Sequence, residues 1–462
     1  MSSTAFSSLK LRLELQDNLT SLGYQAMTAI QAQSLPQILA GKDVIAQGKT
    51  GSGKTAAFAL GLLQQLNVKR FRIQSLVLCP TRELADQVAK EIRKLARTIH
   101  NIKVLTLCGG TAFGPQIGSL AHGAHIVVGT PGRVEEHMRK GTLSLDNVAT
   151  LVLDEADRML EMGFQPALDA IIARAPKKRQ NLLFSATYPA QIKAIAAAVM
   201  TDPVMVKVAA THDNTSISQH FYRVEDNQQR LDALRLLLLA HNPASSVVFC
   251  NTKREVQEVA DELHDYGFSV LALHGDLEQR DRDKALIRFA NKSANILVAT
   301  DVAARGLDIE ALDTVFNYHI ARDSEVHVHR IGRTGRAGSK GHAYSFYSDQ
   351  ESYKVALLED YLDRTITGEA LPDAGVLATK PAAPLMTTLL IDGGKKQKLR
   401  PGDILGALTG EKGIRGDQVG KINVFDFFAY VAVAKSAVTP ALRKLEKGKM
   451  KGRNFRVRIV KD

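Results

Sequence analysis

The fold of this chain is constrained most strongly by short, continuously apolar runs that alternate with helical stretches. Runs such as Leu76–Cys79 and Ile126–Val128 recur in the first half of the chain. Apolar strands of this length are typical of a parallel sheet that helices cover on both faces. After a polar junction the pattern restarts, with runs such as Ile296–Ala299. We therefore predict two α/β domains, at residues 1–208 and 216–364.

A third segment differs in pattern and in charge. Residues 365–384 hold Gly, Ala and three prolines in place of a periodic apolar pattern, which indicates a linker. Residues 385–462 follow the order strand, helix, strand, strand, helix, strand, which predicts a small ferredoxin-like α+β domain. They carry 17 Lys and Arg against 7 Asp and Glu, so most of the chain's net charge of +12 lies there. Such a block is typical of a module that binds a polyanion, although a basic surface that only improves solubility is an alternative.

The composition is that of a soluble globular protein, with 45% hydrophobic and 23% charged residues. No apolar run is long enough to span a membrane, and the N-terminus lacks the basic and apolar regions of a secretion signal. Cys79, Cys108 and Cys250 each end an apolar run, at spacings that suit neither a zinc site nor a disulfide framework. We therefore expect reduced, buried cysteines in a cytoplasmic protein.

Residues 48–55 predict a phosphate-binding loop. They fit the pattern G-x-x-x-x-G-K-[ST], in which backbone N–H groups surround phosphates, a Lys reaches the terminal phosphates and a hydroxyl holds Mg²⁺. An apolar run precedes the loop and a predicted helix follows it, so a phosphate would also face the positive end of a helix dipole. These flanks disfavour the alternative of a glycine-rich surface turn. The loop consists of Gly48, Lys49, Thr50, Gly51, Ser52, Gly53, Lys54 and Thr55.

Carboxylates follow another predicted buried strand. Asp154 and Glu155 come directly after Leu151–Leu153, and carboxylates at this end of a parallel strand can serve the metal of a bound nucleotide. Because Mg²⁺ prefers oxygen ligands, Asp154 is a candidate to hold it together with Thr55. Glu155 is the candidate base that orients and deprotonates an attacking water. Without the phosphate loop, an Asp-Glu pair here would as readily be a helix cap.

A series of short motifs occurs in order along residues 6–350. They are Gly23-Tyr24 with Gln31, the phosphate loop, Pro80-Thr81-Arg82-Glu83-Leu84-Ala85, Gly109-Gly110, Thr130-Pro131-Gly132-Arg133, Asp154-Glu155-Ala156-Asp157, Ser185-Ala186-Thr187, Gln279 with Arg282, Thr300 to Asp308, and His329-Arg330-Ile331-Gly332-Arg333-Thr334-Gly335-Arg336. Each tripeptide alone is weakly specific, whereas the ordered set is highly specific. The set resembles the DEAD-box RNA helicases. This resemblance implies two tandem RecA-like parallel-sheet domains and an enzyme that hydrolyses ATP to ADP and phosphate.

The resemblance assigns ATP contacts in both α/β domains. Tyr24 offers a flat face to stack on adenine, and Gln31 can hydrogen-bond its edge, although without the family a solvent-facing Gln would be favoured. Arg333 and Arg336 are expected to stabilise charge on the transferred phosphoryl group; otherwise they would be phosphate or surface contacts. The further contacts to ATP implied for the second domain are Gly306 and Asp308.

Further residues are implied to link hydrolysis to strand separation. Ser185 and Thr187 resemble the coupling motif, with Asp157 and His329 in the same polar network. Lys54 belongs with the catalytic group because it reaches the terminal phosphates. Small hydroxyls can exchange hydrogen bonds as two domains close, whereas the plain alternative is helix capping.

The resemblance also implies contacts to the RNA backbone. Hydroxyls, backbone amides and arginines on loops suit phosphate and 2′-OH groups, which position RNA without reading its sequence. We therefore expect the core to be indifferent to RNA sequence. The residues concerned are Pro80, Thr81, Arg82, Gly109, Gly110, Thr130, Pro131, Gly132, Arg133, Gln279, Arg282 and Thr300.

The chain departs from the family pattern at four positions. Ala29 replaces a usual Pro, and Gly48 a frequent Ala. His319 and Ala321 stand before the last motif, where an Asp and a Pro are common. None of these changes removes a catalytic group, so they affect only the fine geometry.

The C-terminal segment is expected to be an RNA recognition motif-like domain. Its residues 426–433 meet part of an aromatic strand motif at Phe428 and Tyr430 but lack the leading basic-Gly pair and the final aromatic. These aromatics bind RNA bases or pack in the core, and basic residues are candidates to do more of the binding. The basic candidates are Lys395, Lys396, Lys398, Arg400, Arg453, Arg456 and Arg458.

A DEAD-box core joined to such a segment resembles the DbpA-type bacterial branch. The branch implies 23S ribosomal RNA as target and assembly of the large (50S) ribosomal subunit as the process. We expect a monomer that separates short RNA duplexes and binds no membrane. Two alternatives are an ATP-gated RNA clamp or remodelling scaffold with little unwinding, and a DNA helicase of the same two-domain class.

Overall fold

The computed structural model describes residues 4–48, 51–208, 217–304, 312–335, 340–411 and 413–460. The chain divides near residue 212 into two compact units, and each is described by itself. Within the described ranges, no helix is both long and apolar enough to cross a membrane.

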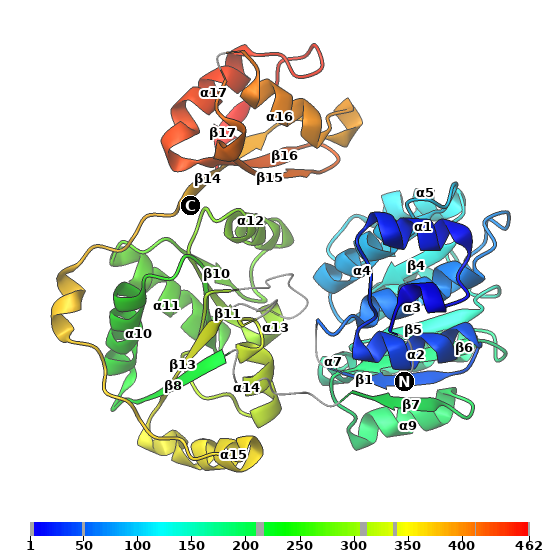
Figure 1. Ribbon diagram of the computed structural model, residues 1–462, viewed down its shortest axis with the longest axis horizontal. Coiled ribbons are helices and arrows are strands. Elements are labelled where there is room, and N and C mark those ends of the chain that lie inside the picture. Colours follow the sequence, from blue (N-terminus) through cyan, green and yellow to red (C-terminus); the bar gives the residue numbers. More distant parts are fainter. Residues whose placement is uncertain are drawn as a thin grey trace. The chain divides into compact units, whose positions relative to one another are not determined.

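The first unit contains a seven-stranded parallel sheet in the order β3-β4-β2-β5-β6-β1-β7 (Figure 1). Helices cover both faces of the sheet, and one buried apolar cluster lies on each side of it. The strands are β1 (Val44–Gln47), β2 (Ser75–Leu78), β3 (Val104–Leu107), β4 (Ile126–Gly129), β5 (Thr150–Asp154), β6 (Gln180–Ser185) and β7 (Val204–Lys207). The helices are α1 (Leu13–Ser21), α2 (Ala29–Leu39), α3 (Lys54–Gln65), α4 (Arg82–Leu95), α5 (Phe113–Ala121), α6 (Pro131–Arg139), α7 (Ala156–Glu161), α8 (Gln165–Arg174) and α9 (Ala190–Val199).

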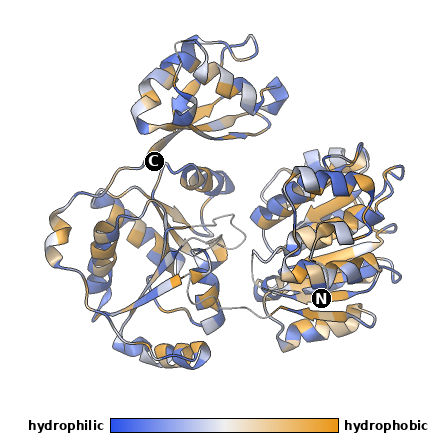
Figure 2. Ribbon diagram, in the orientation of Figure 1, coloured by the Kyte–Doolittle hydropathy of each residue, from blue (hydrophilic) through white to orange (hydrophobic). Residues whose placement is uncertain are grey.

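The second unit begins with a six-stranded parallel sheet in the order β10-β11-β9-β12-β13-β8. In Figure 2 many strands of the two parallel sheets are largely orange, because helices cover both faces, whereas the edge strand β8 is largely blue to white. The strands are β8 (Ile217–Arg223), β9 (Ser246–Cys250), β10 (Val270–Leu273), β11 (Ile296–Thr300), β12 (Thr314–Asn317) and β13 (Gly341–Tyr347). The helices are α10 (Asn227–His241), α11 (Lys253–Asp265), α12 (Gln279–Ala290), α13 (Asp301–Ala304), α14 (Ser324–Ile331) and α15 (Ser352–Leu362).

The C-terminal part of the second unit is a four-stranded antiparallel sheet in the order β15-β16-β14-β17. The predicted order of strands and helices is confirmed. The elements are β14 (Met386–Ile391), α16 (Pro401–Thr409), β15 (Val419–Val424), β16 (Ala429–Ala434), α17 (Val438–Lys447) and β17 (Val457–Ile459). The two predicted parallel-sheet domains and the small α+β domain are therefore all present.

The segment before this small domain lies along the second parallel-sheet domain. The backbone N–H of Glu369 donates to the carbonyl oxygen of Phe221 at 2.7 Å, and Ile366 packs in an apolar cluster with Val355 and Leu358. A short 3-10 helix, η3 (Ala374–Ala378), contacts α10. Residues 365–384 thus pack against the domain that precedes them.

All three cysteines are buried and unpaired. Burial raises the pKa of Cys108 to about 12, so its thiol stays protonated and behaves as a small apolar group. This agrees with the buried cysteines predicted from the sequence.

Candidate nucleotide and RNA sites

The phosphate loop joins β1 to α3. Strand β1 ends at Gln47 and α3 begins at Lys54. Gly53 has a φ of 94°, a left-handed conformation that favours glycine. A Cβ atom at Gly48 would lie 2.7 Å from the Cδ1 atom of Ile30, so a side chain there would displace its neighbour. Lys49 and Thr50 lie outside the described residues.

The polar groups of this loop fit a nucleotide phosphate. Lys54 is buried, and its ammonium donates to the carbonyl oxygen of Gly48 at 2.6 Å. The hydroxyl of Ser52 is buried and has no hydrogen-bond partner among the residues that the structure describes. A buried cation and an unsatisfied hydroxyl at the start of a helix are both stabilised by an anion. Gly51 and Thr55 complete the described part of the loop.

Gln31 holds the phosphate loop from helix α2. Its amide Nε2 donates to the carbonyl oxygen of Gly53 at 3.0 Å, and its Oε1 accepts from the backbone N–H of Thr28 at 2.9 Å. These bonds use one of two amide hydrogens and one of two oxygen lone pairs. The contact of Gln31 with adenine stays a prediction, and it would use the remaining hydrogen and lone pair.

Both the hydroxyl group and the ring of Tyr24 hold its side chain in place. The hydroxyl donates to Glu91 at 2.8 Å and accepts from Lys94 at 3.2 Å. Phe6 packs edge-on against the ring, with 6.0 Å between ring centroids. Burial and the bond to Glu91 raise the pKa of Tyr24, so the ring stays neutral. Its stacking on adenine stays a prediction.

The acidic residues lie beside the phosphate loop because β1, β6 and β5 are neighbouring parallel strands. Asp154 ends β5 and is only 3% exposed. Burial and the adjacent Glu155 charge raise the pKa of Asp154 to about 7, although Lys54 opposes this effect. A buried carboxyl group with this electrostatic environment fits a divalent cation, which would stabilise its ionised form.

Glu155 has an unusual backbone conformation. Its φ of 51° is left-handed, which is uncommon for a residue with a side chain. Glu155 stands directly between β5 and α7. Such strain of about 1–3 kcal/mol tends to persist at functional sites. The left-handed backbone of Glu155 therefore supports its choice as the candidate base.

Asp157 and Thr187 connect the loops that follow β5 and β6. The Oδ2 atom of Asp157 accepts from the backbone N–H and from the hydroxyl of Thr187, both at 2.9 Å. Against the effect of burial, Arg158 and these two bonds lower the pKa of Asp157. Ser185, at the end of β6, accepts through its carbonyl oxygen from the N–H of Gly48 at 3.0 Å. Hydrogen bonds therefore join the segments that follow β1, β5 and β6.

The residues predicted to bind RNA in the first unit follow β2, β4 and β3, which are neighbours at the other half of the sheet. Thr81 caps α4 by accepting from the N–H of Leu84 at 3.2 Å. Gly110, after β3, has a φ of 70°. The guanidinium of Arg133 donates to the carbonyl oxygen of Thr111 at 3.1 Å. The remaining members of this set are Pro80, Arg82, Gly109, Thr130, Pro131 and Gly132.

The carboxyl-end edge of the first sheet therefore carries two groups of residues. The nucleotide candidates follow β1, β6 and β5, and the RNA candidates follow β2, β4 and β3. Arg82 carries a buried Nη1 atom with no partner among the described residues. A buried, unsatisfied guanidinium nitrogen fits a phosphate oxygen.

In the second unit, Gln279 and Arg282 lie in the first turn of α12, and Thr300 ends β11. His329 lies on α14, and Arg333 follows that helix. Gly306, Asp308 and Arg336 lie outside the described residues.

The second unit also holds an ion pair to which the sequence analysis assigned no role. Arg330 is 2% exposed, and it donates to the two carboxylate oxygens of Asp301 at 2.6 and 2.8 Å. The only sequence signal was that both residues lie within motif stretches. The pair fixes α14, which leads to Arg333.

The C-terminal domain carries an aromatic cluster. Phe428 is 37% exposed and stacks on Phe425 with ring centroids 5.0 Å apart. Tyr430 is half-buried and lies 5.6 Å from Phe428. Phe425 and the exposed Phe427 were missed as site candidates, although they stand in the same stretch. The predicted basic residues Lys395, Lys396, Lys398, Arg400, Arg453, Arg456 and Arg458 are exposed.

Part of this domain's outer sheet face contacts the preceding parallel-sheet domain. The hydroxyl of Thr388 is buried between the Nδ2 atom of Asn291 at 3.2 Å and the hydroxyl of Ser293 at 2.7 Å. Thr388 pairs with Ala432 of β16, on the face that also carries Tyr430. The preceding domain therefore covers that part of the sheet. The exposed aromatic residues Phe425, Phe427 and Phe428 lie in the turn between β15 and β16.

Comparison with known proteins identifies the class. Three family models match in chain order: DEAD/DEAH box helicase over residues 28–195, helicase conserved C-terminal domain over 229–338 and DbpA RNA binding domain over 388–459. The ATP-dependent RNA helicase DbpA of Escherichia coli K12 is 54% identical over 459 residues, covering 99% of this chain and 100% of the relative. The DEAD-box ATP-dependent RNA helicase CshA of Bacillus subtilis 168 is 43% identical, covering 78% of this chain and 72% of the relative.

Solved structures agree with this match. Saccharomyces cerevisiae Dbp5 bound to RNA and ADP BeF3 has a TM-score of 0.72 and 30% identity, covering 79% of this chain and 96% of that chain. Mss116p bound to ssRNA and AMP-PNP has a TM-score of 0.72 and 26% identity, covering 81% of each chain. The chain belongs to the DEAD-box family of ATP-dependent RNA helicases. Its third domain and its full-length similarity make it a DbpA-type member, as the sequence resemblance predicted.

Proposed function

We propose that this RNA helicase opens short duplexes in 23S ribosomal RNA during assembly of the large ribosomal subunit, as a cytoplasmic monomer. The core activity is supported by the edge of the first sheet at which the loops after β1, β5 and β6 meet. There a buried Lys54 and a Ser52 hydroxyl with no partner among the described residues follow β1, and a buried Asp154 ends β5 of the same sheet.

Different residues of the chain would serve different steps of ATP hydrolysis. Thr55 and Asp154 would hold Mg²⁺, which neutralises charge on the nucleotide phosphates. Glu155 would orient the attacking water and accept its proton. Arg333 and Arg336 would stabilise the charge that develops on the transferred phosphoryl group. The Asp157–Thr187 contact would couple the state of the nucleotide to the RNA-binding loops.

The C-terminal domain would select the RNA. Its exposed basic residues suit phosphate contacts, and Phe425, Phe427 and Phe428 offer aromatic faces to unpaired bases. Anchoring to one RNA would raise the effective concentration of the helicase core near the duplex that it opens.

ATP hydrolysis stimulated by a 23S rRNA fragment and by generic RNA tests this proposal, with the full chain and with a chain that ends at residue 384. We expect the rRNA fragment to stimulate the full chain at a much lower concentration than generic RNA, and this advantage to be lost on truncation. Equal stimulation of both proteins by both RNAs would refute the targeting role. Stimulation by DNA as strong as by RNA would refute the choice of RNA as substrate.

A further inference from the structure

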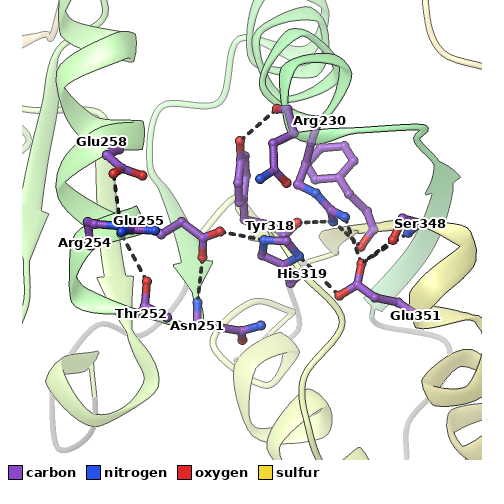
Figure 3. Close-up of polar contacts among 12 residues, drawn as sticks. Arg230, Asn251, Thr252, Arg254, Glu255, Glu258, Tyr318, His319, Ser348 and Glu351 are labelled. Carbon is purple, nitrogen blue, oxygen red and sulfur yellow. Dashed lines mark hydrogen bonds and ion pairs between the residues drawn. The ribbon is translucent and has the colours of Figure 1, made fainter.

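A cluster of charged side chains lies at the carboxyl-end edge of the second parallel sheet (Figure 3). His319 follows β12, Glu255 lies in the first turn of α11, and Glu351 ends the short 3-10 helix η2 (Asp349–Glu351). The Nε2 atom of His319 lies 2.6 Å from Oε1 of Glu255. Its Nδ1 atom lies 3.2 Å from Oε1 of Glu351. The imidazole therefore bridges two carboxylates that belong to different elements.

The geometry requires a proton on both ring nitrogens of His319. A neutral imidazole carries one N–H donor and one acceptor nitrogen, so it would turn a lone pair toward one carboxylate. The imidazolium donates to both. Against the effect of burial, the hydrogen bonds to Glu255 and Glu351 raise the pKa of His319 above its ordinary value of 6.5. Against burial again, His319 and Arg230 lower the pKa of Glu351 to about 2.

The two carboxylates depend on His319 to different degrees. Glu351 also pairs with Arg230 of α10 at 2.8 Å and with Lys354 of α15 at 3.4 Å. The carboxylate of Glu255 has one other hydrogen-bond donor among those recorded for the described residues, the backbone N–H of Asn251 at 3.0 Å. Loss of the His319 proton would therefore leave the half-buried Glu255 with less charge compensation than Glu351.

Two hydrogen bonds join this cluster to Arg330. The Nη1 atom of Arg330 donates to the carbonyl oxygen of His319 at 2.9 Å. Its Nη2 atom donates to Oδ1 of Asn251 at 3.2 Å, and Asn251 is the residue whose N–H binds Glu255. On its other side Arg330 is held by Asp301. Arg330 lies one turn before Arg333, so its position sets the exit of α14.

We propose that His319, as a cation between Glu255 and Glu351, is a positioning residue that holds Arg330 and the segment leading to Arg333 in the arrangement needed for ATP hydrolysis. The inference rests on the proposed role of Arg333. His319 stands where an Asp is common in the family. An acidic side chain at this position could not bridge two carboxylates.

The direction of the pH effect follows from the raised pKa of His319. The bridge is complete below pH 6.5, the ordinary value, and it is lost as the pH rises through the raised value of the folded protein. Tyr318, the adjacent titratable side chain, stays a neutral phenol because burial raises its pKa. The charge of the cluster therefore changes at His319 as the pH rises above 6.5.

The test compares the RNA-stimulated ATPase rate of the full-length wild type with that of His319→Gln from about pH 6 to about pH 9. Because other groups affect both proteins alike, the ratio of the two rates isolates His319. We expect the ratio of the wild-type rate to the His319→Gln rate to fall toward one as the pH rises, because the wild type then also lacks the cationic bridge. Glu255→Gln should move the fall to lower pH. His220→Gln is the matched control, because His220 pairs with Glu369 through one nitrogen only.

An NMR titration of the histidine ring signals in the full chain, with His319 assigned from His319→Gln, gives a readout that does not depend on activity. We expect His319 to titrate above pH 6.5 and at a lower pH in Glu255→Gln. A His319 that titrates at or below its ordinary value would overturn the bridge. A constant rate ratio would overturn the link to Arg330 even if the bridge is present. A wild type without RNA-stimulated ATPase at any pH would instead contradict the proposed function.

Discussion

Replacing Gly53 by Ala should weaken ATP binding strongly, because Gly53 combines a left-handed backbone with close packing. Its φ is 94°, and a Cβ atom would lie 2.5 Å from Nε2 of Gln31. The left-handed conformation costs an Ala about 1–2 kcal/mol. Displacing Gln31 breaks its bond to the carbonyl oxygen of Gly53, which costs about 1–3 kcal/mol for a buried group. The sum of about 2–5 kcal/mol corresponds to a loss of about 30- to 4,000-fold in affinity.

A titration with a fluorescent ATP analogue measures this loss, and Gly41→Ala is the matched control. Gly41 also has a positive φ, of 77°, but a Cβ atom there would meet nothing within 4 Å. We expect Gly41→Ala to bind the analogue as the wild type does. If the affinity of Gly53→Ala for the analogue were within about threefold of that of the wild type, ATP binding would not depend on the left-handed backbone and close packing of Gly53.

Two further substitutions test individual contacts. Thr187→Val removes a hydrogen bond to the carboxylate of Asp157 and should lower RNA unwinding more than RNA-stimulated ATPase; an equal loss of both activities would refute its coupling role. Thr388→Val removes two buried hydrogen bonds, worth about 1–3 kcal/mol. Hydrogen exchange of β14 should then accelerate, whereas Thr387→Val on the same strand should leave it unchanged. Unchanged exchange in Thr388→Val would mean that the contact does not hold the two domains together.

Most strands of the two parallel sheets could be predicted because they are continuous apolar runs, which few other structures accommodate. Strands β8 and β13 were missed because polar residues such as His220 and Ser345 interrupt their apolar residues. The order of the strands could not, because β2, β4 and β3 become neighbours through crossovers that the local pattern does not encode. The packing of residues 365–384 was also missed, since contacts such as that of Glu369 with Phe221 join segments far apart in the chain.

The site residues could be named from motifs, but their contacts could not. Gln31 was expected to face adenine, whereas its amide also supports the phosphate loop at Gly53. The cluster around His319 collects side chains from α10, α11 and η2. The sequence marked His319 only as a departure from the family pattern. Its bridging position depends on residues that are close in space but distant in the chain.

The central claim is that ATP hydrolysis at this site opens RNA. A strand-separation assay on a short RNA duplex, with wild type and Glu155→Gln, tests it most directly. We expect ATP-dependent strand separation by the wild type. Glu155→Gln should still bind ATP but hydrolyse it about 100-fold or more slowly, because the base is lost. Full hydrolysis by Glu155→Gln would contradict the catalytic assignment. RNA-stimulated hydrolysis by the wild type without strand separation would identify an RNA clamp instead of a helicase.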